Sequence, residues 1–164
     1  MPVTPTGILS EPLATLRSLV SECPSFQTWV GAVDAATAAE RIHLIVAPAD
    51  GPFPCALIDF GDVARERQAI TNAGRWKMRA GSDLLLWFKA EASGEEPDAT
   101  FTFTNAVGAI LEEMEARAGD YAKGFPGITV IEMPVPPVRT EEEDRASQGD
   151  VFEVCFSCNL SRAA

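Results

Sequence analysis

The first strong pattern in the chain is helical. Within residues 11–22, apolar side chains recur every three or four positions, which is the spacing of one buried helix face. The stripe consists of Leu13, Leu16, Leu19, Val20 and Cys23. We expect Ser10 to cap this helix, with Pro12 tolerated in its first turn. Residues 1–10 are then an extended lead-in, and residues 11–164 form a single domain.

Two shorter helical segments are expected next. Pro24 starts one that ends at Gly31, and Asp34 caps another over residues 35–41. An apolar stretch at residues 42–47 follows them.

Period-two alternation predicts the strands. Residues 55–60 are apolar enough for one strand. In residues 74–80, apolar side chains alternate with basic ones, and a turn leads into the apolar residues 84–92. We expect these last two segments to form a β-hairpin with one apolar and one polar face.

The clearest helix is expected in the second half of the chain, capped by Asp98 or Thr100 and stopped by Gly119. Its apolar stripe consists of Phe103, Val107, Ile110, Leu111, Met114 and Ala118. A final hairpin pairs residues 128–138 with the alternating residues 152–160. The prolines of residues 128–138 push that segment towards a sheet edge.

The order of elements is therefore helices, strand, hairpin, helix, hairpin. Strands that cluster without a helix between each pair favour an antiparallel arrangement. We predict an α+β fold, with a mainly antiparallel sheet of about four to five strands and helices packed on one face.

Net charge excludes several classes of partner. The formal charge is −11, and residues 1–90 hold 8 basic and 9 acidic side chains, whereas residues 91–164 hold 5 and 15. A nucleic-acid binder needs a basic surface, and so does a protein that binds anionic membranes. No apolar run approaches the roughly 20 residues that span a bilayer. We expect no sequence-specific nucleic acid and no membrane among the partners.

Catalytic groups are scarce. His43 is the single histidine, and it lies in an apolar stretch that favours a structural role. The chain has no nucleophile elbow, phosphate-binding loop or dinucleotide fingerprint. We therefore predict that the protein is not an enzyme and that it has no catalytic residues and no cofactor.

Cys155 and Cys158 have the C-x-x-C spacing of a metal knuckle or redox pair. They fall within a predicted strand, however, where positions three apart point to opposite faces. The opening MPVTPTGILSEPL lacks a secretory pattern, so we expect all four cysteines to be reduced thiols in a cytosolic product and no metal to be bound.

Two charged groups are candidate interface residues. The basic group consists of Arg65, Arg67, Arg75, Lys77 and Arg79, and the acidic group of Glu141, Glu142, Glu143 and Asp144. The acidic group lies in a charged hairpin connector at residues 139–150, and it lacks the alternating register of a calcium loop. Either group can be simply a solvated face. The alternative is that the basic group of one subunit meets the acidic group of its neighbour in head-to-tail association.

The chain resembles the tail terminator and head–tail joining (neck) proteins of long-tailed bacteriophages. The similarity lies in the opening helix LATLRSLVSEC, the hairpin GRWKMRAGSDLLLWFKAEA, the helix FTNAVGAILEEMEARAG and the terminal pair ITVIEMPVPPV and DVFEVCFSCNL. The segments FQTWVGAVDAATAAERIHL and PCALIDFGD are also similar to small phage neck proteins. The likeness covers about residues 11–160 and rests on element order, while the short helices at 24–41 depart from it.

The resemblance implies a structural virion protein, assembled in the host cytoplasm and located in the tail or neck. Such proteins form a ring, usually of six subunits, at the head-proximal end of the tail tube, where they stop tube assembly. Their partners are further copies of themselves, the tail-tube protein and a head-completion or connector protein. DNA passes through the lumen of the ring, which an acidic lining would keep from sticking.

Two alternatives of other classes remain open. One is a small cytosolic ligand-binding or enzymatic domain with a pocket near Trp29, His43 and Trp87. The other is a dimeric regulatory or chaperone-like module that holds a basic partner with its acidic connector.

Overall fold

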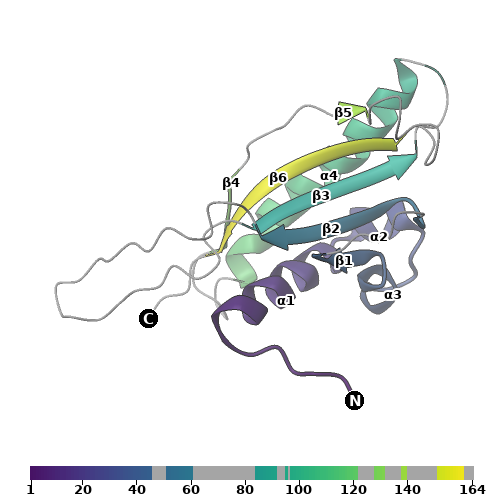
Figure 1. Ribbon diagram of the computed structural model, residues 1–164. Coiled ribbons are helices and arrows are strands. Elements are labelled where there is room, and N and C mark those ends of the chain that lie inside the picture. The colour runs from purple at the N-terminus through teal and green to yellow at the C-terminus, as the bar shows by residue number, and fades with distance from the viewer. Residues whose placement is uncertain are drawn as a thin grey trace.

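A mixed sheet with helices along one face forms the architecture of the protein (Figure 1). The computed structural model describes residues 1–45, 51–60, 84–91, 95, 97–121, 128–131, 138–139 and 151–160. The elements are, in chain order, α1 (Gly7–Ser21), α2 (Pro24–Val30), α3 (Ala35–Ala39), β1 (Ile42–Leu44), β2 (Cys55–Phe60), β3 (Leu84–Glu91), α4 (Asp98–Tyr121), β4 (Ile128–Ile131), β5 (Val138–Arg139) and β6 (Val151–Leu160).

The sheet is mainly antiparallel. Its strand order is β1-β2-β3-β6-β4, and the short β5 also pairs with β6. Of the pairings between described strands, β1 with β2 is parallel and the others are antiparallel. The strands β2, β3, β4 and β6 have four or more residues, while β1 and β5 add three and two. The predicted α+β class is confirmed.

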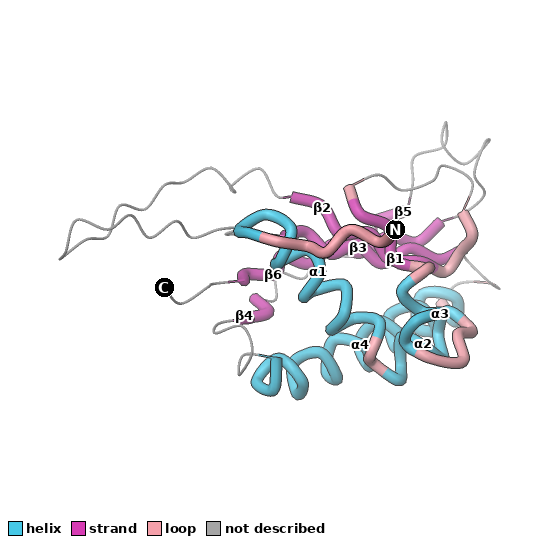
Figure 2. The backbone as a smooth tube through the Cα atoms, turned by 90° about the horizontal axis from the view of Figure 1, so that it is seen from below, coloured by secondary structure: helices cyan, strands magenta, loops and turns pink. Residues whose placement is uncertain are grey.

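The helices that the structure describes, α1 to α4, lie on the same side of the sheet, as the view along its edge shows (Figure 2). The stripe predicted for α4 is buried along its whole length, and so are Phe152, Val154, Phe156 and Cys158 on the matching face of β6. Both patterns predicted correctly which side chains form the core, because a single buried face sets the period of each element.

Aromatic rings fill the centre of the layer between helices and sheet. Phe88 of β3 is fully buried, and its ring centroid lies 6.3 Å from that of Phe26, 5.8 Å from that of Trp29 and 6.1 Å from that of Phe156. Tilted and edge-to-face contacts at these distances are favourable for aromatic pairs. The central strand β3 is thus held directly against α2 and β6.

Polar contacts tie the helices to one another. The Glu113 carboxylate of α4 accepts hydrogen bonds from the Ser25 backbone N–H at 2.9 Å and from the Ser25 hydroxyl at 2.6 Å. A carboxylate placed there meets the unpaired N–H groups of the first turn of α2. On the other side, the Arg17 guanidinium donates to the Ala39 carbonyl at 2.9 Å and fixes the end of α3 to α1.

The first helix starts earlier than its pattern predicts. It begins at Gly7, with Thr6 rather than Ser10 at the N-cap, so the second part of the predicted lead-in is helical. Pro12 lies inside the helix and not in its first turn. A proline removes one backbone hydrogen bond, and the buried stripe that follows Pro12 favours the helix in spite of that loss. Similarly, α4 continues through Gly119 to Tyr121.

The predicted hairpin of residues 74–92 is wrong in its pairing. Both sides of β3 are occupied, by β2 over Leu84–Lys89 and by β6 over Leu84–Glu91. Alternation shows which face a side chain takes, but it carries no information on which strand lies beside it. The strand expected at residues 74–80 lies outside the described residues.

Candidate functional site

The sheet face opposite the helices is the candidate site. Alternation along β1, β2, β3 and β6 directs one set of side chains away from the helices, and we call this set the open face. Its members are His43, Cys55, Leu57, Asp59, Leu85, Trp87, Lys89, Glu91, Val151, Glu153, Cys155 and Ser157, of which Cys55, Val151 and Cys155 are buried. No described helix covers this face (Figures 1 and 2). Trp87 and the two leucines are only half-buried there.

Strand register places Trp87 at the middle of the open face. His43, Leu57, Trp87 and Cys155 are successive partners across β1, β2, β3 and β6, and so form one continuous row. Cross-strand partners on one face stand close enough for their side chains to touch. The row is apolar at its centre, with an imidazole at one end and a thiol at the other.

An ion pair lies next to this row. Lys89 and Glu153 are direct partners in register, and the Lys89 ammonium lies 2.9 Å from the Glu153 carboxylate. The same ammonium is 5.8 Å from the centroid of the Trp87 ring. A partly exposed pair contributes only about 0–1 kcal/mol to stability. Its more useful property is position, because it fixes charged groups beside an accessible tryptophan.

The two C-x-x-C cysteines point to opposite faces, as the alternation predicts. Both lie in the regular ladder of β6, with Cys158 in the core and Cys155 on the open face. The pKa of Cys155 is raised to about 11, mainly by burial and to a smaller extent by the nearby Glu153 carboxylate. The pKa of Cys158 is raised to about 12, mainly by burial and to a smaller extent by electrostatic interaction with Cys155. Both thiols are therefore protonated at neutral pH, which makes them weak nucleophiles and weak metal ligands.

His43 is the titratable group of the row. Its Nε2 atom is buried and has no hydrogen-bond partner in the part of the chain that the structure describes. The pKa of His43 lies below its ordinary value of 6.5, mainly because the imidazole is removed from water and also because Arg41 is positively charged. An imidazole in such a setting is stable in its neutral form and costs free energy when it is charged.

We expect acid to destabilise the protein through His43. The unfolded chain binds the proton more tightly than the folded one, so the stability from neutral His43 is complete above the unfolded pKa of 6.5 and is lost as the pH falls towards the lower folded pKa. An NMR titration of the single imidazole measures the folded pKa directly. The variant His43→Gln should lose less stability than the wild type between about pH 7.5 and 5.5. A folded pKa at or above 6.5 would contradict the expectation.

The structure does not bring together Trp29, His43 and Trp87, which were expected around one pocket. Trp29 packs in the helix layer against Phe88, whereas the other two side chains belong to the open face. The prediction of one ligand pocket shared by these three residues is therefore wrong.

The predicted charged interface residues lie outside the described residues. These are Arg65, Arg67, Arg75, Lys77 and Arg79, together with Glu141, Glu142, Glu143 and Asp144. The charged pair that the structure does describe, Lys89 with Glu153, was missed by sequence reasoning. Each residue lies on the face of its strand that points away from the helices, but pairing them requires the register between β3 and β6, which local sequence does not contain.

Searches for other kinds of site and for relatives gave no match. Within the described residues, no three His, Cys, Asp or Glu side chains are grouped so that they could hold a metal ion. Among the described helices, none combines the length and the apolar character that crossing a bilayer requires. Comparisons with protein-family models, curated proteins and solved structures found nothing that matches this chain.

Proposed function

We propose that this protein is a structural subunit that assembles with copies of itself through the open face. The observation that carries the proposal is the half-buried Trp87 at the centre of a sheet face that no described helix covers. Tryptophan is the residue type most enriched among side chains that dominate the binding energy of protein interfaces. The adjacent ion pair of Lys89 and Glu153 has the position of a polar rim around such an anchor.

A second exposed apolar group lies at the edge of the sheet. Leu44, at the end of the edge strand β1, is 40% exposed, and Ile45 next to it is 50% exposed. Exposed apolar residues on a sheet edge favour association with another chain. The open face and this edge are different surfaces of one subunit. Contact between two different surfaces generates a closed ring when the rotation between subunits closes.

A ring of this kind fits the phage tail role that the resemblance implies. In this proposal the protein forms the ring, of about six subunits, at the head-proximal end of a tail and is part of the virion. It stops the growth of the tail tube and offers a joining surface to a head-completion or connector protein. The helix-covered side keeps each subunit folded, while the open face and the β1 edge make the contacts between subunits.

Reversing three charges of the basic group should weaken assembly. The triple variant with Arg75, Lys77 and Arg79 changed to Glu places like charges against the acidic group of the neighbour, which costs binding free energy at low salt. We expect a lower fraction of oligomer in analytical ultracentrifugation and unchanged far-UV circular dichroism. A control reverses the same number of charged side chains, Glu112, Glu115 and Arg117, on α4. Equal assembly of the triple variant and the wild type would rule out the electrostatic contact.

A further inference from the structure

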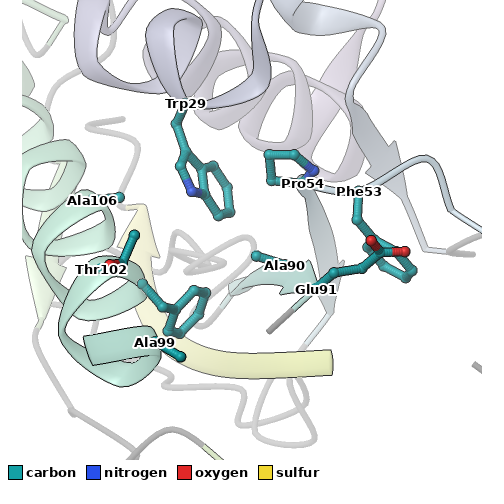
Figure 3. Close-up of a pocket in the computed structure, with 9 residues that line it drawn as sticks. Trp29, Phe53, Pro54, Ala90, Glu91, Ala99, Thr102 and Ala106 are labelled. Carbon is teal, nitrogen blue, oxygen red and sulfur yellow. The ribbon is translucent and has the colours of Figure 1, made fainter. Parts of the chain in front are cut away.

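A pocket lies on the helix-covered side of the sheet, between α2, the start of α4 and the end of β3 (Figure 3). It has a volume of about 280 Å³. The residues that matter for its chemistry are Trp29, Phe53, Pro54, Glu91, Thr102 and Phe103. Ligand pockets in proteins begin at roughly 300 Å³, so this one has the size for a compact group rather than for an extended molecule.

Three aromatic rings form the walls. Trp29 and Phe103 have ring centroids 6.3 Å apart, and each is fixed from behind by a second ring. Phe88 lies 5.8 Å from Trp29, and Phe152 stacks on Phe103 at 5.4 Å. The third ring, that of Phe53, follows Pro52 and precedes Pro54, whose fixed φ angles restrict the backbone on both sides. The pocket is thus lined by rings that are already held in place.

The rim of the pocket is negatively charged. Glu91 is exposed and lines the pocket beside Phe53, and its carboxylate points towards that end (Figure 3). Glu95 and Asp98, both exposed, lie at the start of α4 next to the lining helix residues. Two described basic side chains lie near this region: the Arg41 guanidinium donates to the Pro54 carbonyl at 3.4 Å, and the Lys89 ammonium, two residues before Glu91, lies 2.9 Å from the Glu153 carboxylate. Because Glu153 balances Lys89, the carboxylates of Glu91, Glu95 and Asp98 outnumber the one remaining cation, Arg41, and this region is net negative.

We propose that this pocket binds a methylated ammonium group. Cations are attracted to the faces of tryptophan and phenylalanine rings, and recognition of quaternary ammonium by such rings is a recurrent use of this attraction. A carboxylate at the rim adds a direct charge interaction and selects against anions. The positive end of the α4 dipole opposes a cation, and Asp98 in the first turn offsets it. The proposal does not depend on ring formation, because the aromatic walls and Thr102 lie on the helix-covered side of the sheet and only Glu91, at the end of β3, belongs to the open face.

Methylation of the ligand follows from the scarcity of acceptors. A primary ammonium group carries three N–H donors, each of which needs an acceptor when it leaves water. Among the lining side chains, Glu91 and Thr102 carry the oxygen atoms that can accept; the Thr102 hydroxyl donates to the Asp98 carbonyl at 2.8 Å and keeps its lone pairs, so two acceptor groups face three donors. A trimethylammonium group has no N–H donor to satisfy, so it enters this site without that cost.

Binding of choline tests the proposal. The probe is titrated into the full-length protein while the Trp29 indole N–H is followed by NMR, with the signal assigned through Trp29→Phe. The neutral comparison is 3,3-dimethylbutan-1-ol, in which carbon replaces the quaternary nitrogen. We expect saturable shifts of the Trp29 signal, with choline binding about fivefold to tenfold more tightly than the alcohol. Equal affinities, or no saturable shift with either probe, would overturn the proposal.

Substitutions at the rim and in the walls of the pocket measure their separate contributions to choline binding. Glu91→Gln should weaken choline binding about threefold to fivefold and leave the affinity for the alcohol unchanged. The substitution removes the charge of the side chain but keeps its size and shape. Glu115→Gln, an equal change at an exposed position of α4 away from the pocket, should alter neither affinity. Phe53→Leu should weaken the binding of choline more than the binding of the alcohol. If Glu91→Gln and Glu115→Gln behave alike, the carboxylate has no part in binding and the site is not the one proposed.

A further titration identifies the source of the ammonium group. A short peptide that carries trimethyllysine offers the same head on a protein side chain, and choline offers it as a small molecule. Tighter binding of the peptide supports a protein partner, and tighter binding of choline supports a metabolite. If neither ligand shifts the Trp29 signal, this pocket is not the binding site.

Discussion

Replacing Phe88 by alanine should lower the free energy of unfolding by about 3–5 kcal/mol. Phe88 is fully buried in the central strand and touches the rings of Phe26, Trp29 and Phe156. Its removal forfeits the transfer free energy of the ring and leaves a cavity where α2, β3 and β6 meet. The aromatic layer is close-packed from several elements, so the neighbouring rings cannot collapse fully into the space.

Urea unfolding monitored by circular dichroism measures this loss. The matched control is Phe101→Ala, the same chemical change at a position on α4 that is 58% exposed, and it should shift stability by no more than about 0.5 kcal/mol. A loss under about 1 kcal/mol for Phe88→Ala would mean that the layer between helices and sheet is not packed as described.

Replacing Trp87 by alanine should weaken self-association by about thirtyfold or more, which corresponds to the roughly 2 kcal/mol that defines a dominant interface residue. Trp87 is the neighbour of Phe88 in sequence and lies on the opposite face of β3. Its ring is half-buried within the subunit, so the variant should keep the fold. The two adjacent positions therefore separate assembly from folding.

Sedimentation velocity of Trp87→Ala over a range of concentrations measures the change in association. Phe101→Ala again serves as the control, because it removes an exposed ring that does not belong to the open face. An unchanged association constant for Trp87→Ala would show that the open face makes no contact between copies. Association lost in both variants would point to α4 instead.

The parts of the fold that the sequence predicts are those where one element has one buried face. The stripe of α4 and the alternation of β6 needed no knowledge of neighbours, and both match the buried side chains. The opposite orientation of Cys155 and Cys158 followed from the same rule. Periodicity is a local property, so it survives without tertiary information.

Strand neighbours and element ends were not predictable in this way. The hairpin expected at residues 74–92 assumed that adjacent segments pair, whereas β3 pairs with β2 and with the distant β6. The parallel strand β1 was seen only as an apolar stretch, because three residues carry too little pattern. The start of α1 lies earlier than predicted, because Pro12 favours a first turn by local pattern whereas the helix begins at Gly7 and keeps this proline in its interior.

The candidate site depended on the same missing information. His43, Leu57 and Trp87 lie in one row only once the register of three strands is known. Trp29 had appeared to belong with His43 and Trp87, since all three stand out in the sequence. The sheet separates it from them. Conversely, the pocket near Glu91 joins segments that are remote in the chain, and no local signal indicated it.

Multi-angle light scattering of the purified wild-type protein, at low and at moderate salt, tests the central claim most directly. If the protein assembles through its open face into a closed ring, the mass at low salt should be that of one discrete oligomer, about six chains, with no larger species. Part of this oligomer should dissociate as salt screens the charged contacts. A single-chain mass at every concentration and both salt conditions would contradict the claim.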